Sequence, residues 1–226
     1  MNTLIYHLMR IASLVLSRHV WVINHLSVVR GRLLKQAHRK MLFLDLDGTL
    51  WPDSGSGAIL KCQRISKDWK KYISQAKRDG YHVAIFTNQT LFSRNPKFLI
   101  WEFLLYVWSL GKLFCVTRPA VLLVCHHHPN AQFAPLKLDC SFRKPSPVSI
   151  QYVLRRLRCE PQLSFLIGDR ISDAIAGNLA GLQTNLVKVN PEMFVCNVSG
   201  NYPESCYAFF KPSYTDNPSN LRRSFI

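Results

Sequence analysis

The chain has 226 residues, of which 48% are hydrophobic and 19% are charged. This length fits one domain with extensions, and the apolar content excludes a chain that has too few apolar side chains to bury a core. The seven cysteines form no regular framework, so we expect free thiols in a reducing compartment rather than a disulfide scaffold. The net charge of +16 favours anionic partners, whether nucleic acid, anionic lipid or a phosphorylated sugar.

The first 40 residues hold seven Lys or Arg and no acidic residue. Apolar residues recur there near helical spacing: Leu4, Ile5, Leu8, Ile11, Ala12, Val15 and Leu16. We expect a basic amphipathic extension over residues 1–39. Three interpretations stay open: an organelle presequence, a helix in peripheral contact with an anionic membrane, and a helix packed on the domain. Arg18 and His19 interrupt the apolar stretch, so we expect no transmembrane segment.

The apolar run after this extension predicts a buried strand over 41–45, which ends in the sequence Asp45-Leu46-Asp47-Gly48-Thr49. Two carboxylates two residues apart point to the same side of a strand. Burying two like charges so close is costly unless a cation or hydrogen bonds offset it. Gly48 lets the backbone turn tightly beside a ligand. The segment therefore predicts a site for a metal and a phosphate.

A polar segment over 52–58 follows, in which Asp53 is either a contact to a sugar hydroxyl of the substrate or a plain turn residue. We then expect a helix over 64–79 and a strand over 82–86 that ends in Thr87-Asn88-Gln89. Taken alone, Thr87-Asn88 is more typical of a helix cap than of a functional site.

The next apolar segments predict a helix over 97–110, a possible extra strand over 113–117 and a strand over 121–125. The last of these ends at Cys125, within a run of one cysteine and three histidines. A loop with Cys140 and Arg143-Lys144-Pro145 then leads into a helix over 147–157.

A strand over 163–167 ends in Gly168-Asp169-Arg170, and Asp173 follows Asp169 by four residues. We expect a helix over 172–180 and a strand over 185–189. Residues 191–226 are rich in Pro, Asn and Ser, which predicts an irregular tail.

Strands that alternate with helices predict an α/β fold, with a Rossmann-like parallel sheet and helices on both faces. The polar clusters stand at the carboxyl ends of strands or at the starts of helices, where open α/β sheets bind ligands. Only 37 residues separate Thr49 from Thr87, and a helix and a strand fill them, so we expect no large cap domain.

On these four motifs the chain resembles the haloacid dehalogenase superfamily of phosphohydrolases, and we place that domain at residues 40–190. It is most similar to the branch of the heptose-bisphosphate and histidinol-phosphate phosphatases in three segments: Thr87-Asn88-Gln89, the loop 143–147, and 168–177. Polynucleotide 3′-phosphatases share the first two motifs and are close competitors.

The resemblance implies that Asp45 is the nucleophile that forms an aspartyl-phosphate and that Asp47 is the general acid and base. It also implies that Thr87 and Lys144 bind phosphoryl oxygens, where charge develops in the transition state.

The metal implied by the resemblance is Mg²⁺, held by Asp45, Asp169 and the backbone carbonyl of Asp47. Asp173 is expected to bind a metal-bound water or Lys144. Further substrate contacts are expected from five polar or charged residues: Asp53, Asn88, Gln89, Arg143 and Arg170.

The related heptose-bisphosphate phosphatases carry Cys-x-His and Cys-x-Cys between the second and third of the four motifs, and these residues bind a structural zinc. This chain matches them with Cys125, His127 and Cys140, but Phe142 stands in place of the fourth ligand. A structural Zn²⁺ site needs four ligands, and His126 or His128 could fill the open position. We favour a loop without metal and keep Zn²⁺ as the alternative.

The sequence thus predicts a Mg²⁺-dependent phosphomonoesterase that acts on a phosphorylated sugar or a similar small metabolite. A polynucleotide 3′-phosphatase is the alternative that the net charge and an open site favour. A non-catalytic adaptor is the third possibility. We expect a cytoplasmic protein, with the organelle presequence as the competing interpretation.

Overall fold

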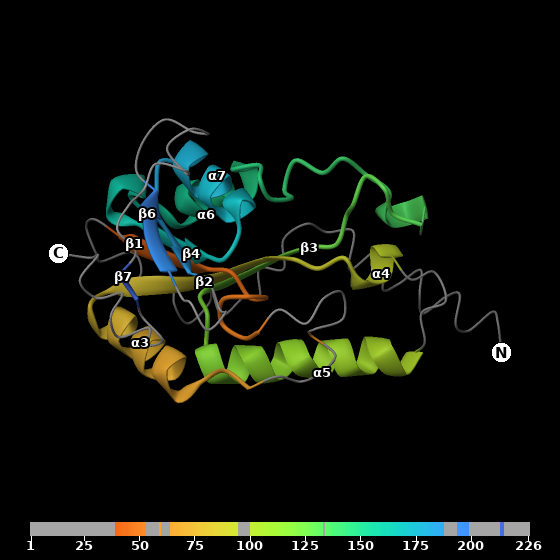
Figure 1. Ribbon diagram of the computed structural model, residues 1–226, viewed down its shortest axis with the longest axis horizontal. Helices are drawn as coiled ribbons and strands as arrows, with labels where there is room; N and C mark the ends of the chain where they lie inside the picture. The colour runs from red at the N-terminus through yellow and green to blue at the C-terminus, as the bar shows by residue number, and fades with distance from the viewer. Residues whose placement is uncertain are drawn as a thin grey trace.

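The computed structural model describes residues 39–52, 59, 64–94, 100–132, 134–187, 194–198 and 213–214 (Figure 1). The expectations for the extension before Arg39 and for Asp53 fall outside these residues. Among the described helices, none combines the length and apolar character needed to cross a bilayer.

One sheet of seven strands forms the centre of the molecule, in the order β3-β2-β1-β4-β5-β6-β7. The strands are β1 (Lys40–Leu44), β2 (Tyr81–Asn88), β3 (Val121–Cys125), β4 (Phe165–Gly168), β5 (Gln183–Val187), β6 (Phe194–Val198) and β7 (Ser213–Tyr214). The first five strands in this order pair in parallel, and β6 and β7 add antiparallel ladders at one edge. The predicted α/β class with a parallel sheet is confirmed. Its strand order reverses between β1 and β4, which is where such sheets bind ligands.

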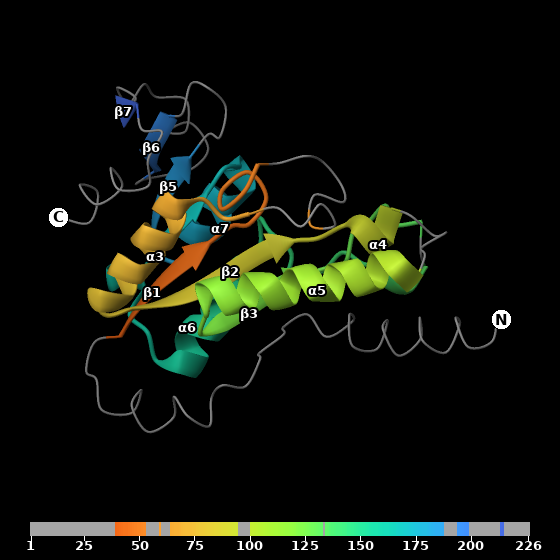
Figure 2. The same ribbon diagram turned by 90° about the horizontal axis from the view of Figure 1, so that it is seen from below.

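Helices cover both faces of the sheet (Figures 1 and 2). They are α3 (Lys67–Arg78), α4 (Leu91–Arg94), α5 (Ile100–Thr117), α6 (Val148–Leu157) and α7 (Ile171–Leu179), with 3-10 turns at Ala134–Leu136 and Pro161–Leu163. In both views α3 and α5 lie on one face, and α6 and α7 lie on the other. Ser66 starts α3, because its side chain accepts a hydrogen bond from the Trp69 N–H at 3.1 Å. Among the described residues there is no cap domain.

The two faces of the sheet have separate cores, because alternate side chains of a strand point in opposite directions. Leu42 and Leu44 of β1 are fully buried in the core on the α3 and α5 face, together with Tyr106. Met41 and Phe43 are fully buried in the core on the α6 and α7 face. The sheet is therefore covered on both sides, as parallel sheets require.

The possible strand over 113–117 is wrong, since these residues form the last turns of α5. No proline interrupts the segment, so the helix continues. Leu113 lies on the same buried face as Tyr106 and Leu110, at helical spacing.

The tail after residue 190 is less irregular than its composition predicts. β6 pairs antiparallel with β5, with Leu186 opposite Cys196, and β7 pairs with β6. The segment Phe194–Val198 is rich in residues that favour strands, and it extends the edge that β5 leaves open.

Candidate active site

The carboxyl ends of β1, β2 and β4 bring the polar motifs to one edge of the sheet. Asp45 follows β1 directly, and its backbone N–H donates to the Ile167 carbonyl of β4 at 2.9 Å. Thr87 lies in β2, beside β1, and Asp169 follows β4. Lys144 reaches the same place from the loop before α6, where it forms a salt bridge with Asp45. The structure thus joins all four predicted motifs.

Lys144 lies between two carboxylates at the centre of this cluster. Its Nζ is 2.5 Å from Asp45 Oδ1 and 2.5 Å from Asp173 Oδ1, and all three residues are buried. Burial alone would lower the pKa of Lys144, but the Asp173 and Asp45 carboxylates outweigh it and raise the pKa above its ordinary value. Lys144 is therefore cationic at neutral pH and can face a phosphoryl oxygen.

Asn88 fixes the backbone that carries this lysine. Its side-chain amide donates to the Lys144 carbonyl and accepts from the Lys144 N–H, both at 3.2 Å. We predicted Asn88 as a substrate contact; in the described structure it holds the loop of Lys144 against the end of β2.

Asp45, Asp169 and Asp173 each offer a carboxylate oxygen, and these oxygens lie within 4.8 Å of one another. Burial raises the pKa of Asp45 well above its usual range, although Lys144 opposes this. Burial and the nearby Asp173 carboxylate raise the pKa of Asp169 to about 6. Its buried Oδ1 accepts no hydrogen bond from a described donor. A hard cation such as Mg²⁺ fits this cluster, because its positive charge offsets the repulsion among the buried carboxylates.

Gly48 gives Asp169 room beside the turn after β1. Gly48 has φ of +84°, a left-handed conformation that glycine adopts without strain. A Cβ at this position would overlap the carboxylate of Asp169. The glycine thus explains why the carboxyl ends of β1 and β4 can approach so closely.

Asp47 is held by donors at both of its carboxylate oxygens. The Trp51 indole N–H donates to Oδ1 at 2.7 Å, and the Gln89 amide donates to Oδ2 at 2.5 Å. The same amide donates to Thr87 Oγ1 at 3.0 Å. We predicted Gln89 as a substrate contact; in the described structure its side chain contacts Asp47, the predicted acid. Trp51 was not predicted as a site residue, although its position four residues after Asp47, within one tight turn, was a usable signal.

The two arginines that we predicted as substrate contacts, Arg143 and Arg170, lie away from Lys144 at the centre of the carboxylate cluster. Arg143 donates to the backbone carbonyl of His127 at 2.8 Å, so it braces the histidine-rich loop. The Arg170 side chain is 59% exposed, with its Nε 3.8 Å from Asp169 Oδ2, at the rim of the cluster. The backbone N–H of Arg170 donates to Asp173 Oδ2 at 3.0 Å, which orients Asp173.

Comparison with known proteins agrees with this geometry. The HAD-hydrolase-like family model matches residues 141–191. The D-glycero-beta-D-manno-heptose-1,7-bisphosphate 7-phosphatase of Pasteurella multocida is 30% identical over 156 residues, which cover 66% of this chain and 82% of the relative. The chain belongs to the HAD-like hydrolases. The corresponding phosphatase of Haemophilus ducreyi is 28% identical over 154 residues, with the same two coverages.

Solved structures place the fold in the same group. A HAD-like protein from Mesorhizobium loti is 29% identical, covers 69% of this chain and 78% of its own, and has a TM-score of 0.57. The D,D-heptose 1,7-bisphosphate phosphatase of B. bronchiseptica, complexed with magnesium and phosphate, has a TM-score of 0.56 at 18% identity, over 82% of this chain and 97% of its own. This HAD-like protein is a phosphatase, a hydrolase of phosphoric monoesters.

The cysteine and histidine loop of the HAD-like phosphatase forms a second cluster. Cys125, His127 and Cys140 are buried, and their ligand atoms lie within 4.8 Å of one another. Burial, followed by the neighbouring Cys140, raises the pKa of the Cys125 thiol to about 12. A cation would favour the thiolate form, so the three donors suit a soft metal ion.

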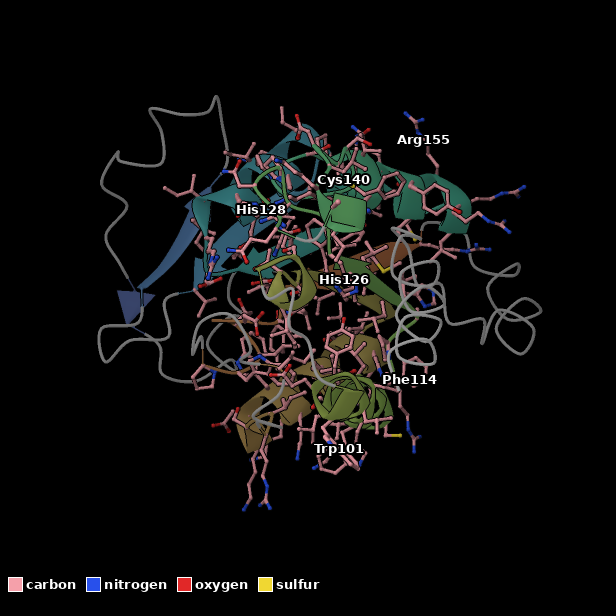
Figure 3. The ribbon with its side chains drawn as sticks, turned by 90° about the vertical axis from the view of Figure 1, so that its right-hand side faces the viewer. Trp101, Phe114, His126, His128, Cys140 and Arg155 are labelled. Atoms are coloured by element: carbon pink, nitrogen blue, oxygen red, sulfur yellow. The ribbon has the colours of Figure 1, made fainter. Side chains whose placement is uncertain are left out.

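His126 does not complete this cluster. Its ring nitrogens lie 3.2 Å from the Tyr106 hydroxyl and 3.2 Å from the Gln89 carbonyl. His126 is buried, and Figure 3 shows it apart from Cys140. The expectation that His126 could be the fourth ligand is wrong, because its ring is engaged by the core. Phe142, at the fourth position of the motif, has its ring 6.1 Å from that of Tyr152.

Proposed function

We propose that this phosphatase hydrolyses small phosphorylated sugars or similar metabolites through an aspartyl-phosphate on Asp45, with Mg²⁺ as its cofactor. The observation that carries the proposal is the salt bridge between Asp45 and Lys144, beside Asp169, in a buried carboxylate cluster. The substrate class is supported by the heptose bisphosphate named for the Pasteurella and Haemophilus relatives.

Asp45, Asp169 and the Asp47 carbonyl would hold Mg²⁺, which supplies positive charge against the phosphoryl oxygens when bound. Lys144 and the Thr87 hydroxyl bind further phosphoryl oxygens. These groups orient the phosphorus toward Asp45, because the same lysine contacts both the carboxylate and the incoming phosphate.

The reaction takes two displacements. Asp45 forms a bond to phosphorus as the ester bond breaks, and Asp47 gives its proton to the leaving oxygen. Asp47 then takes a proton from a water molecule that attacks the phosphorus, which frees Asp45 and inorganic phosphate. The hydrogen bonds from Trp51 and Gln89 fix the direction of the Asp47 carboxylate during both steps.

A polynucleotide 3′-phosphatase is the second candidate, favoured by the net charge of +16 and by the lack of a cap among the described residues. Turnover of a heptose bisphosphate is compared with turnover of a 3′-phosphorylated oligonucleotide, each with Mg²⁺ and with EDTA. We expect the sugar phosphate to be the better substrate by at least tenfold in kcat/KM, and no turnover with EDTA. The reverse preference would establish the nucleic-acid activity. The adaptor alternative is set aside, since the chain is a phosphatase.

We further propose that Cys125, His127 and Cys140 bind Zn²⁺. The fourth ligand of the ion would come from a group other than these three residues. The spacing of the three donors supports Zn²⁺ over the metal-free loop that the sequence favoured. Metal analysis of the purified protein and of Cys140→Ser tests this, with one zinc expected in the first and much less in the second. Equal zinc in both would contradict it.

Cys115, Cys125, Cys140 and Cys159 form no disulfide in the described part of the chain. They fit a reducing compartment, so we propose the cytoplasm as the location. Location of the tagged full chain by microscopy tests this, and import into an organelle would favour a presequence in the first 39 residues.

A further inference from the structure

Helix α5 exposes a stripe of large apolar side chains to solvent. Trp101 is 70% exposed and Trp108 is 52% exposed, and Leu104 and Leu105 lie between them on the same face. Their spacing of three, four and seven residues aligns them along one side of the helix. The other side of α5 is packed into the core by Tyr106. The helix is therefore apolar on both its buried and its outer side, which a helix facing only water is not.

Lys112 adds a positive charge to this outer face. Lys112 lies with its Nζ 4.1 Å from the centre of the Trp108 ring, so it joins the stripe as a cation beside an aromatic group. Glu102 is the acidic residue of α5, and it is half-buried rather than exposed. Trp101 points away from the body of the molecule in Figure 3.

The neighbouring helix α3 presents a basic face on the same side of the sheet (Figures 1 and 2). Its exposed basic residues are Lys67, Lys70, Lys71, Lys77 and Arg78, whereas Asp68 is half-buried and the exposed acid is Asp79 at its end. Lys77 Nζ donates to the carbonyls of Thr117 and Arg118 at 2.5 Å and 2.9 Å, which ties α3 to the end of α5. The two helices thus form one layer, apolar and aromatic on α5 and basic on α3.

We propose that this α3–α5 layer docks on an anionic lipid bilayer. Trp and Leu side chains enter the interface between headgroups and acyl chains, and Lys67, Lys70 and Lys71 of α3 contact the anionic headgroups. A bilayer matches both helices at once. A second copy of the chain would match the apolar stripe but would bring another basic α3 with it, and like charges oppose such a contact.

The proposed docking face leaves the phosphatase site open. The carboxylate cluster lies at the carboxyl ends of the strands, whereas α3 and α5 cover one face of the sheet. Docking and hydrolysis therefore use different parts of the molecule and can be tested separately.

The test is flotation of the full chain with vesicles of phosphatidylcholine alone and of phosphatidylcholine with about one third phosphatidylserine. We expect binding to the anionic vesicles only. Trp101→Ser with Trp108→Ser should weaken that binding at least tenfold, while Leu179→Ser, a 60% exposed residue of α7, should not. All variants should keep wild-type phosphatase activity on a soluble substrate, which shows that they fold.

Substitutions that remove positive charges from α3 test its role in binding. Lys70→Gln and Lys71→Gln should each weaken binding about fivefold, since a lysine near an anionic surface contributes about 1 kcal/mol. The matched control is Arg155→Gln with Arg156→Gln, exposed on α6; Figure 3 shows Arg155 on the opposite side of the molecule from Trp101.

Three results would overturn the proposal. The first is full binding by the double tryptophan variant, which would assign any membrane contact to another part of the chain. The second is equal binding to neutral and anionic vesicles. The third is a wild-type dimer that dissociates in the double tryptophan variant without vesicle binding, which would make the stripe a contact between two copies.

Discussion

The indole N–H of Trp51 donates to Asp47 Oδ1 at 2.7 Å, from a position only four residues further along the chain. Trp51 is 4% exposed, so this hydrogen bond is sheltered from water. With Gln89 on the other oxygen, it leaves the Asp47 carboxylate little freedom to turn.

Trp51→Phe should therefore lower kcat about 10- to 100-fold, because a hydrogen bond to a charged group contributes about 1.5–3 kcal/mol. KM should change little, since Trp51 orients the proposed acid rather than the phosphate. Steady-state kinetics measures both. The control is Trp69→Phe, a buried tryptophan of α3, which should leave kcat unchanged. An equal loss in both variants would show that Trp51 acts only through packing.

Gly48→Ala should weaken Mg²⁺ binding more than tenfold, since the new methyl group would displace the Asp169 carboxylate. The left-handed backbone adds a cost of about 1–2 kcal/mol in stability. Calorimetric titration with Mg²⁺ gives the affinity. Gly111→Ala is the control, because its Cβ position in α5 has no atom within 4 Å apart from the adjacent residues and the backbone of the helix itself, and it should raise the free energy of unfolding by about 0.5–1 kcal/mol. Unaltered Mg²⁺ affinity in Gly48→Ala would exclude the proposed role of Asp169.

Lys144→Met should destabilise the protein by about 3–5 kcal/mol and abolish turnover, because it leaves Asp45 and Asp173 buried without their cation. Mg²⁺ should raise the Tm of this variant more than that of the wild type, since the ion replaces part of the lost charge. Thermal melts with Mg²⁺ and with EDTA measure this difference. The same Mg²⁺-dependent shift in both proteins would show that the metal does not bind beside Lys144.

Acid should weaken Mg²⁺ binding, because the ion needs carboxylates in their ionised form. The pKa of Asp169 is raised to about 6, so protons compete with Mg²⁺ as the pH falls below about 6. We expect Kd for Mg²⁺ to rise about tenfold per pH unit in that range and to level off above about pH 7. Titrations at pH 5 and pH 7.5 check the sign. A Kd that is equal or lower at pH 5 would contradict the assignment.

The sequence predicted which residues meet at this edge of the sheet, because its polar residues follow apolar runs directly. Asp45, Thr87 and Asp169 each stand at the end of a strand, and the parallel sheet brings these ends together. No knowledge of side-chain contacts is needed for that inference, only the periodicity of the strands.

Side-chain contacts between segments that are far apart in the chain could not be predicted from the sequence. Nothing in the order of residues shows that Asn88 holds the Lys144 backbone, since 56 residues separate them. His126 looked like a metal ligand because it stands beside two other histidines, but the core uses its ring. The helical continuation to Thr117 was missed because a short apolar run fits a strand as well as a helix.

The central claim is that Asp45 carries the phosphoryl group. The most direct measurement is rapid acid quenching of Asp47→Asn during turnover of an aryl phosphate, whose leaving group needs no proton from Asp47, followed by mass spectrometry of the peptide that contains Asp45. Asparagine cannot activate the water, so the intermediate should accumulate, with one phosphoryl group on Asp45 and none after Asp45→Asn. A phosphoryl group on another residue, or turnover by Asp45→Asn, would contradict the account.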